Sequence, residues 1–329
     1  MPLDFDSATR CADLLCVESE GFLAIATTRA RLTDATWQTA LTTMRGHADS
    51  SAVMISQATD LLGANFAETW QLLPSRLASL AIRPPMTSCL ITRSNDSIQR
   101  ALRLADGTSE FALWHCLVEL AKSGASLAIQ PASANDEFVS TATGNNADWL
   151  PELLSSPPRR ELDWLFGELK LTRLSDLCDE VVSPADATAV LAGLWLLHGD
   201  ADASHRQSQS IEDEGRHRCG NFWHAIMHRQ EPDYGNSKYW FRRVGQHPII
   251  PELAQRADEL IAADDSESAR RWRVKLGTPT GWNVSTFVDW CEAAAREADA
   301  RQINLIRRIQ FVEMHLLLRA SFADATQPT

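Results

Sequence analysis

The sequence predicts an α+β, mostly helical protein in which an N-terminal α/β domain is followed by an all-helical C-terminal domain. Strand-like apolar runs alternate with helix-like segments over residues 1–130, and beyond residue 149 the strand-like runs stop. The stretch at 131–148 is small, polar and rich in turn formers. We therefore predict domains at 1–130 and 149–329, joined by a linker or long loop at 131–148.

Short apolar runs and helical periodicity predict the elements of the N-terminal domain. The predicted strands cover 22–27, 52–56, 88–92 and 126–130. The predicted helices cover 33–43, 58–73, 96–104 and 111–122. Within the third of these, Asp96-Ser-Ile-Gln99 has the pattern of a capping box, which marks a helix start.

The C-terminal domain contains a strong helix start at Ser183-Pro184-Ala-Asp186. Serine is a good N-cap, proline fits the first helical position, and an acid favours the first turn. This helix is expected to end at Gly199. Further helices are predicted at 218–229, 234–244, 251–263, 285–298 and 301–322.

Composition limits the environment and the partners of the chain. The formal net charge of the 329 residues is -12, which argues against a nucleic-acid partner because phosphate binding needs a basic surface. No apolar run approaches the roughly 18 residues of a membrane helix, so we expect no membrane partner. The seven cysteines are odd in number and scattered, with no CxxC spacing. Reduced thiols in a cytoplasmic protein are therefore expected.

The segment 198–247 holds most of the chain's histidines, so it is where we expect a functional site. His224 and His228 are spaced i, i+4 on a predicted helix, so both imidazoles leave the same face, as two metal ligands would. The residue after His224 is alanine, not the glutamate that zincin proteases use as a general base. Packing of both histidines in the core, each bonded to a carbonyl, is the alternative.

Two carboxylates precede histidines at i, i+3 in the same segment, in Asp202-Ala-Ser-His205 and Glu214-Gly-Arg-His217. Helical di-iron sites use this pairing. We predict a metal site formed by His205, His224 and His228, with Zn, Fe or Mn as the divalent ion. Cys219 could act as a nucleophile if it met a nearby histidine in space, and a buried thiol is the alternative.

Positive charge also gathers in this part of the chain. Residues 216–247 carry six lysines and arginines against two acids, a net +4 within an acidic chain. Such a basic island favours an anionic small molecule, held by its carboxylate or phosphate group. The alternative is that these cations pair with the surplus acids elsewhere in the protein.

Residues 221–248 resemble a single tetratricopeptide-type helical hairpin. Ala225 occupies the small position of the first helix, and Tyr234, Ser237, Phe241 and Val244 occupy aromatic and small positions of the second. Only one such repeat is found, whereas a solenoid needs about three. The resemblance therefore implies two packed helices and not a peptide-binding array.

Residues 202–248 are also similar to an uncharacterised bacterial protein family. The shared string includes Trp223-His-Ala-Ile-Met-His-Arg229, Glu231-Pro-Asp-Tyr234 and Lys238-Tyr-Trp-Phe-Arg-Arg-Val-Gly245. The family brings no activity with it. The resemblance implies that the polar residues of the string belong to a site, which adds ligand-binding candidates to the three predicted metal ligands: Lys238, Tyr239, Arg242 and His247.

Two functions remain open at this stage. In the first, the helical domain binds a metal or an anionic small molecule, with or without catalysis of a reaction. In the second, the hairpin is a non-catalytic module that docks a protein partner. Convergence of His205, His224 and His228 in space would favour the first function, and their separation would exclude it.

Overall fold

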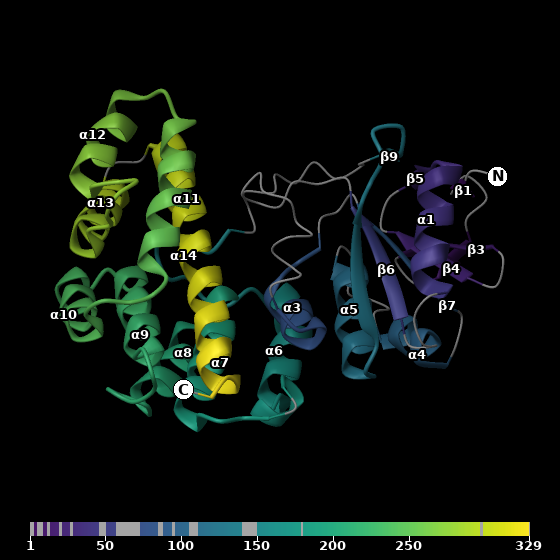
Figure 1. Cartoon of the computed structure of the whole chain (residues 1–329), viewed down its shortest axis with the longest axis horizontal. Coiled ribbons are helices and arrows are strands. Elements are labelled where there is room, and N and C mark those ends of the chain that lie inside the picture. Colours follow the sequence, from purple (N-terminus) through teal and green to yellow (C-terminus); the bar gives the residue numbers. More distant parts are fainter. Residues whose placement is uncertain are drawn as a thin grey trace. The chain divides into compact units, whose positions relative to one another are not determined.

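The computed structural model describes most of the chain (Figure 1). The described residues are 3–4, 9–11, 14–19, 22–26, 29–45, 51–56, 73–84, 88–93, 96–104, 111–139, 150–178, 180–296 and 299–328. The chain divides into two compact units, residues 1–146 and 147–329. The class is α+β and mostly α, with the strands in the first unit.

The N-terminal unit is built on a six-stranded sheet in the order β2-β3-β4-β7-β6-β8. Its strands are β2 (Thr9–Cys11), β3 (Leu14–Ser19), β4 (Phe22–Ala26), β6 (Ser51–Ser56), β7 (Ser88–Arg93) and β8 (Ser126–Pro131). Only the β6–β8 pair is parallel, and the other four pairs of neighbours are antiparallel. The α/β prediction for this domain is corrected to α+β, because its strands pair mainly with antiparallel neighbours.

A second, three-stranded sheet shows that part of the predicted linker belongs to this unit. Strand β5 (Arg29–Leu32) lies between β1 (Leu3–Asp4) and β9 (Glu137–Val139). Just before β9, the buried carboxylate of Asp136 accepts hydrogen bonds from the backbone N–H of Thr33 (2.6 Å) and the hydroxyl of Thr36 (2.8 Å). Polar composition predicted a linker, but these residues anchor the start of α1. The rest of that segment, 140–148, lies outside the described residues.

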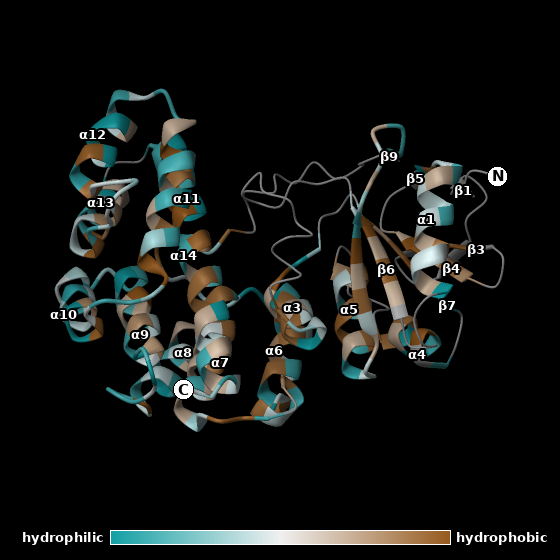
Figure 2. Cartoon of the chain, viewed as in Figure 1, coloured by the Kyte–Doolittle hydropathy of each residue, from teal (hydrophilic) through white to brown (hydrophobic). Residues whose placement is uncertain are grey.

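Four helices of the N-terminal unit are described: α1 (Asp34–Arg45), α3 (Ser75–Ala81), α4 (Asp96–Leu104) and α5 (Ala112–Lys122). Trp37 and Leu41 of α1 are buried in one core with Ile91 of β7. Figure 2 shows the apolar character of the strands at the centre of the main sheet. The helix predicted over 58–73 falls almost wholly outside the described residues, and α3 was not predicted.

In the C-terminal unit, all regular elements that the structure describes are helices. They are α6 (Asp163–Leu171), α7 (Pro184–Leu197), α8 (Ala201–Gln209), α9 (Cys219–Gln230), α10 (Tyr234–Val244), α11 (Ile250–Ala262), α12 (Glu267–Leu276), α13 (Val284–Arg296) and α14 (Ala300–Thr326). Single 3-10 turns cover 160–162 and 174–176. None of the helices among the described residues combines the length and apolar character of a membrane span.

Helix α9 is the central element of this unit, and every one of its residues is buried. It packs against α7, α8, α10 and α14. Gly193 of α7 allows one close approach, since a Cβ at that position would lie 2.4 Å from the Trp223 ring. Helix α10 packs on α9 through Ser237, whose hydroxyl donates to the carbonyl of Ala225 at 2.8 Å. Because α9 is buried on all sides, its polar side chains contact neighbouring helices and not solvent.

Helix caps explain two turns of this unit. Asp200 accepts from the backbone N–H of Ala203 and begins α8, and Asp233 accepts from that of Asn236 and begins α10. Asp186 and Ser183 form the predicted cap of α7. The caps of α8 and α10 fix the start of two helices of the site described below, whereas α9 begins after Arg218 without a side-chain cap.

Buried His315 of α14 makes the stability of the protein pH-dependent. Its Nδ1 lies 3.0 Å from the carbonyl oxygen of Phe311, and burial lowers its pKa from 6.5 to about 4. The unfolded chain thus takes up this proton at a higher pH than the folded chain. The stability contribution is complete above pH 6.5 and is lost as pH falls toward 4, at about 1.4 kcal/mol per pH unit.

We expect His315→Leu to remove this part of the pH dependence. Between pH 7 and pH 5, the free energy of unfolding of the wild type should fall by about 2 kcal/mol more than that of the variant. Denaturant unfolding at both pH values measures the difference. Equal falls in the two proteins would show that His315 is protonated alike in the folded and unfolded chains.

Candidate functional site

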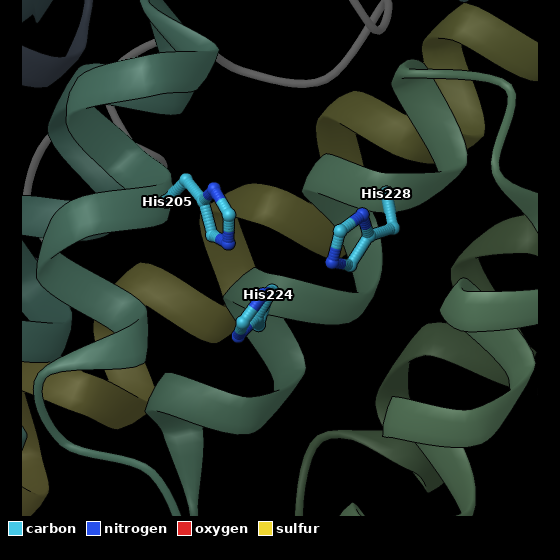
Figure 3. Close-up of side chains that lie close together, drawn as sticks. All are labelled: His205, His224 and His228. Atoms are coloured by element: carbon cyan, nitrogen blue, oxygen red, sulfur yellow. The ribbon is translucent and has the colours of Figure 1, made fainter.

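The three histidines predicted as metal ligands come together between α8 and α9. One ring nitrogen from each of His205, His224 and His228 lies within 4.8 Å of the other two. The ring centroids are 4.7 Å apart for His205 and His224, 5.5 Å for His205 and His228, and 4.7 Å for His224 and His228. Figure 3 shows these imidazoles, one from α8 and two from α9, gathered around one space. We call these three residues the histidine cluster.

His224 is fixed between aromatic rings. The indole of Trp240, on α10, stacks on its imidazole with the centroids 4.1 Å apart and the planes 19° from parallel. Only 2% of His224 is exposed. Among the residues that the structure describes, none forms a hydrogen bond with its Nδ1. A buried nitrogen without a partner is costly in an apolar surrounding, and a bound ligand would remove that cost.

His228 has polar neighbours at both ring nitrogens. The side-chain amide of Asn236 donates to Nε2 at 2.9 Å. A carboxylate oxygen of Glu231 lies 3.2 Å from Nδ1, out of line with a hydrogen bond. In this arrangement the proton sits on Nδ1, and the single lone pair of Nε2 accepts the Asn236 amide, so a metal at Nε2 would have to displace that donor. Metal-binding histidines use this pattern, with a carboxylate at the nitrogen that does not bind the metal.

His205 completes the cluster from the middle of α8 and is only partly buried. Asp202, one turn earlier, is exposed and is not part of the cluster. Glu214 is exposed too, and His217, three residues later, lies outside regular helix and bonds to Asp324 at 2.8 Å. The i, i+3 carboxylate–histidine pairs predicted from the sequence are therefore not assembled into this site.

Electrostatics favour the neutral imidazoles that metals require at two members of the cluster, His224 and His228. Burial, and then the neighbouring imidazoles of His228 and His205, lower the pKa of His224 to about 3. Burial also lowers the pKa of His228, against the opposing effect of the Glu231 carboxylate. Both rings are neutral at pH 7, so each has one unprotonated nitrogen, and that of His228 can bind a cation only in place of the Asn236 amide.

The residues predicted to bind a ligand, other than the three metal ligands, lie outside the histidine cluster. Lys238 pairs with Asp289 of α13, and the hydroxyl of Tyr239 accepts from Arg243 at 2.8 Å. Arg242 is exposed. His247 is buried, and its Nε2 lies 3.5 Å from the sulfur of Cys219. The structure thus brings the three predicted metal ligands together and leaves these four at separate places.

The basic island of residues 216–247 is largely neutralised by acids. Arg243 pairs with Asp213 and with Glu212 (2.6 Å), and Arg229 pairs with Glu313 in the interior. Together with the Lys238 pair, these contacts fit the alternative that the basic residues of this segment form ion pairs with acidic residues elsewhere in the protein. The cations therefore do not by themselves define an anion pocket.

A second group of metal-type ligands was not predicted from the sequence. Asp186, Cys219 and Asp324 are buried, and one ligand atom from each lies within 4.8 Å of the other two. They come from α7, α9 and α14, so their separation in the chain hides them from any spacing rule. Cys219 is a buried thiol, the alternative expected from the sequence, and the histidine beside its sulfur is His247 and not one of those near it in the chain. Comparison with protein-family models, curated proteins and solved structures gave no match to this chain.

Proposed function

We propose that the C-terminal helical unit is a metal-binding module in which the histidine cluster holds one divalent transition-metal ion. The convergence of the three ring nitrogens, within 4.8 Å of one another, carries the proposal. Tetrahedral binding with Zn–N bonds near 2.0–2.1 Å needs nitrogens about 3.4 Å apart. Small side-chain rotations close the remaining gap. The neutral state of the rings and the unpartnered nitrogen of His224 support the same conclusion.

The chemistry of the ligands favours zinc among the metals expected from the sequence. The cluster consists of imidazoles alone, whereas manganese prefers oxygen ligands. Asp202, the acid that a di-iron type of site would use, is outside the cluster. Imidazole suits zinc, and three histidines plus one open position is an arrangement found in catalytic zinc sites.

An open position defines what the site can do. Three neutral ligands leave the full charge of a divalent ion uncompensated, so water, hydroxide or an anionic small molecule is the natural fourth ligand. A zinc ion bound in this way lowers the pKa of its water to about 7. His205 is the member of the cluster that reaches toward solvent, and this provides a route for such a ligand.

Metal titration tests the proposal. Protein stripped by a chelator is titrated with Zn²⁺ in competition with a chromophoric chelator, for the wild type and for His224→Ala/His228→Ala. We expect the double variant to bind one equivalent fewer than the wild type. The loss should exceed the roughly 10–100-fold weakening that follows removal of an outer partner, since two direct ligands are gone.

His198→Ala is the matched control, because it removes a histidine of the same unit that lies at the end of α7, outside the cluster. It should bind metal as the wild type does. Equal stoichiometry and affinity in the wild type and the double variant would refute the site. In that event the alternative function, a helical hairpin that docks a protein partner, would become the better account of this segment.

Glu231 should tune the affinity of the site without binding the metal itself. Its carboxylate lies beside Nδ1 of His228, where it holds the proton away from the ligand nitrogen. We expect Glu231→Gln to weaken Zn²⁺ binding by about 10–100-fold with unchanged stoichiometry. The same competition titration measures this, with Glu212→Gln as a control acid that pairs with Arg243. Wild-type affinity in Glu231→Gln would exclude this role.

A further inference from the structure

The residues Asp186, Cys219 and Asp324, here called the acid–thiol cluster, form an interior site that the histidine cluster does not use. Asp186 lies in the first turn of α7, Cys219 is the first residue of α9, and Asp324 lies near the end of α14. Their exposed fractions are 1%, 0% and 4%. Three helix ends that are distant in the sequence thus place two carboxylates and a thiol in one buried space.

The spacing of these atoms matches a metal site. The thiol of Cys219 donates a hydrogen bond to a carboxylate oxygen of Asp324 at 3.6 Å, and a ligand oxygen of Asp186 is within 4.8 Å of the ligand atoms of both. Around a tetrahedral zinc ion, bonds of about 2.3 Å to sulfur and 2.0–2.2 Å to oxygen place the two ligand atoms about 3.6 Å apart. The observed sulfur–oxygen distance already has that value.

An unsatisfied oxygen independently indicates a missing cation. Oδ2 of Asp186 accepts from the hydroxyl of Ser183 (2.7 Å) and from the backbone N–H of Arg216 (3.0 Å). Its other oxygen, Oδ1, is buried and has no hydrogen-bond donor among the residues that the structure describes. Within the same described residues, Asp186 forms no ion pair. A buried carboxylate in this condition is costly unless a cation balances it.

The outer contacts of the cluster resemble those that hold metal ligands in place. The backbone N–H of Ile249 donates to Nδ1 of His247 (3.4 Å), so the proton of this ring sits on Nε2, 3.5 Å from the sulfur of Cys219. His247 is thus a donor to the sulfur and a positioning residue, not a ligand. His217 binds the carboxylate of Asp324 at 2.8 Å in the same way. Each ligand has an outer partner, as in established metal sites.

We propose that Asp186, Cys219 and Asp324 hold a second metal ion of the zinc class, in a closed site that ties together the ends of α7, α9 and α14. Thiolate together with carboxylate selects a borderline ion such as Zn²⁺ over Mg²⁺ or Ca²⁺, which prefer oxygen alone. Binding replaces the thiol proton of Cys219, which leaves to solvent as the metal–sulfur bond forms. Its three protein ligands are buried, whereas the histidine cluster is partly exposed.

The two sites are separate on helix α9. Cys219 and His224 are five residues apart, which corresponds to about 7.5 Å along the helix and a turn of roughly 140° around it. The clusters therefore face different sides of α9 and share no ligand. Either site can be lost while the other remains, so the two proposals can fail independently.

Cobalt substitution distinguishes the second site from the first. Co²⁺ bound to a thiolate gives an intense near-ultraviolet charge-transfer band, and Co²⁺ bound to imidazoles alone does not. Stripped, reduced wild-type protein titrated with Co²⁺ should develop this band to saturation within two equivalents, since the histidine cluster also takes up Co²⁺, and His224→Ala/His228→Ala should reach saturation at one. The band should be absent in Cys219→Ser and in Asp186→Asn, and it should persist in His224→Ala/His228→Ala.

Cys291→Ser is the matched control, because Cys291 is another fully buried thiol, located on α13 and outside the cluster. It should keep the band and the stabilisation by metal. A second readout covers folding defects: Zn²⁺ should raise the melting temperature of Cys291→Ser and of His224→Ala/His228→Ala, but should raise that of Cys219→Ser by less. A wild type without the band in excess Co²⁺, or a band that survives in Cys219→Ser, overturns the proposal.

Discussion

Replacing Arg229 with methionine is expected to lower the free energy of unfolding by about 3–5 kcal/mol. Arg229 is the residue after His228 on α9, and its guanidinium pairs with Glu313 of α14 where both side chains are fully buried. It also donates to the side-chain oxygen of Gln310 at 3.2 Å and lies over the ring of Phe287. The variant leaves the Glu313 carboxylate without a cation in the interior, which is the costly half of a broken buried pair.

Removing both charges separates the ion pair from the rest of the packing. Arg229→Met/Glu313→Leu should recover most of the stability that Arg229→Met loses, because apolar replacement of a whole buried pair is often neutral. Arg296→Met breaks an exposed i, i+4 pair with Glu292 and should change stability little. Denaturant unfolding of all variants gives the comparison. A double variant no more stable than the single one would assign the loss to packing around Phe287 and not to the unpaired charge.

Local sequence signals were sufficient for elements with strong caps or clear periodicity. The Ser183-Pro184 start of α7, and the helices α9, α10, α11, α13 and α14, were predicted within a few residues. The helices α6, α8 and α12 were not individually predicted. Helix α8 reads Ala-Asp-Ala-Ser-His-Arg-Gln-Ser-Gln and has little apolar periodicity, so its helical state depends on the Asp200 cap and on packing against α7 and α9.

The pairing of strands depended on contacts that the sequence does not encode locally. The predicted strands at β4, β6, β7 and β8 exist, but their alternation with helices did not indicate which strands pair or in which direction. Strand β3, which was not predicted, pairs antiparallel with β4 along its whole length and shifts the sheet to α+β. Asp136 likewise lies in a polar stretch typical of a linker, and only its hydrogen bonds to Thr33 and Thr36 place it in the fold.

The site follows the same division between local and distant information. The i, i+4 spacing of His224 and His228 is a helical property, so their shared face could be predicted from the sequence. The position of His205 beside them depends on the packing of α8 on α9. The only indication of it in the sequence was the family resemblance over residues 202–248. Asp186 and Asp324 are 138 positions apart in the chain. No local sequence pattern around Asp186 or Asp324 indicates that the two residues meet in the fold. The sequence predicted for Asp186 only the role of an acid at a helix start.

Replacing Trp240 with alanine is expected to cost about 3–5 kcal/mol of stability and to weaken the histidine cluster at the same time. The indole is 7% exposed and is held between two groups: the imidazole of His224 on one side, with centroids 4.1 Å apart, and the guanidinium of Arg243, 5.0 Å from the ring. Its removal opens a cavity between α9 and α10. It also frees the His224 ring to leave the orientation in which it meets His205 and His228.

Trp240→Phe separates these two effects, because a smaller ring can still stack on His224 while leaving part of the volume empty. Denaturant unfolding measures stability, and Zn²⁺ competition below the unfolding temperature measures affinity. We expect Trp240→Ala to bind zinc about 10–100-fold more weakly, in the range for lost outer support, and Trp240→Phe to stay close to the wild type. Wild-type affinity in a destabilised Trp240→Ala would mean that α8 and α9 alone orient the imidazoles. The Trp240–His224 stack would then contribute only to stability, and helices α8 and α9 would determine the geometry of the site without α10.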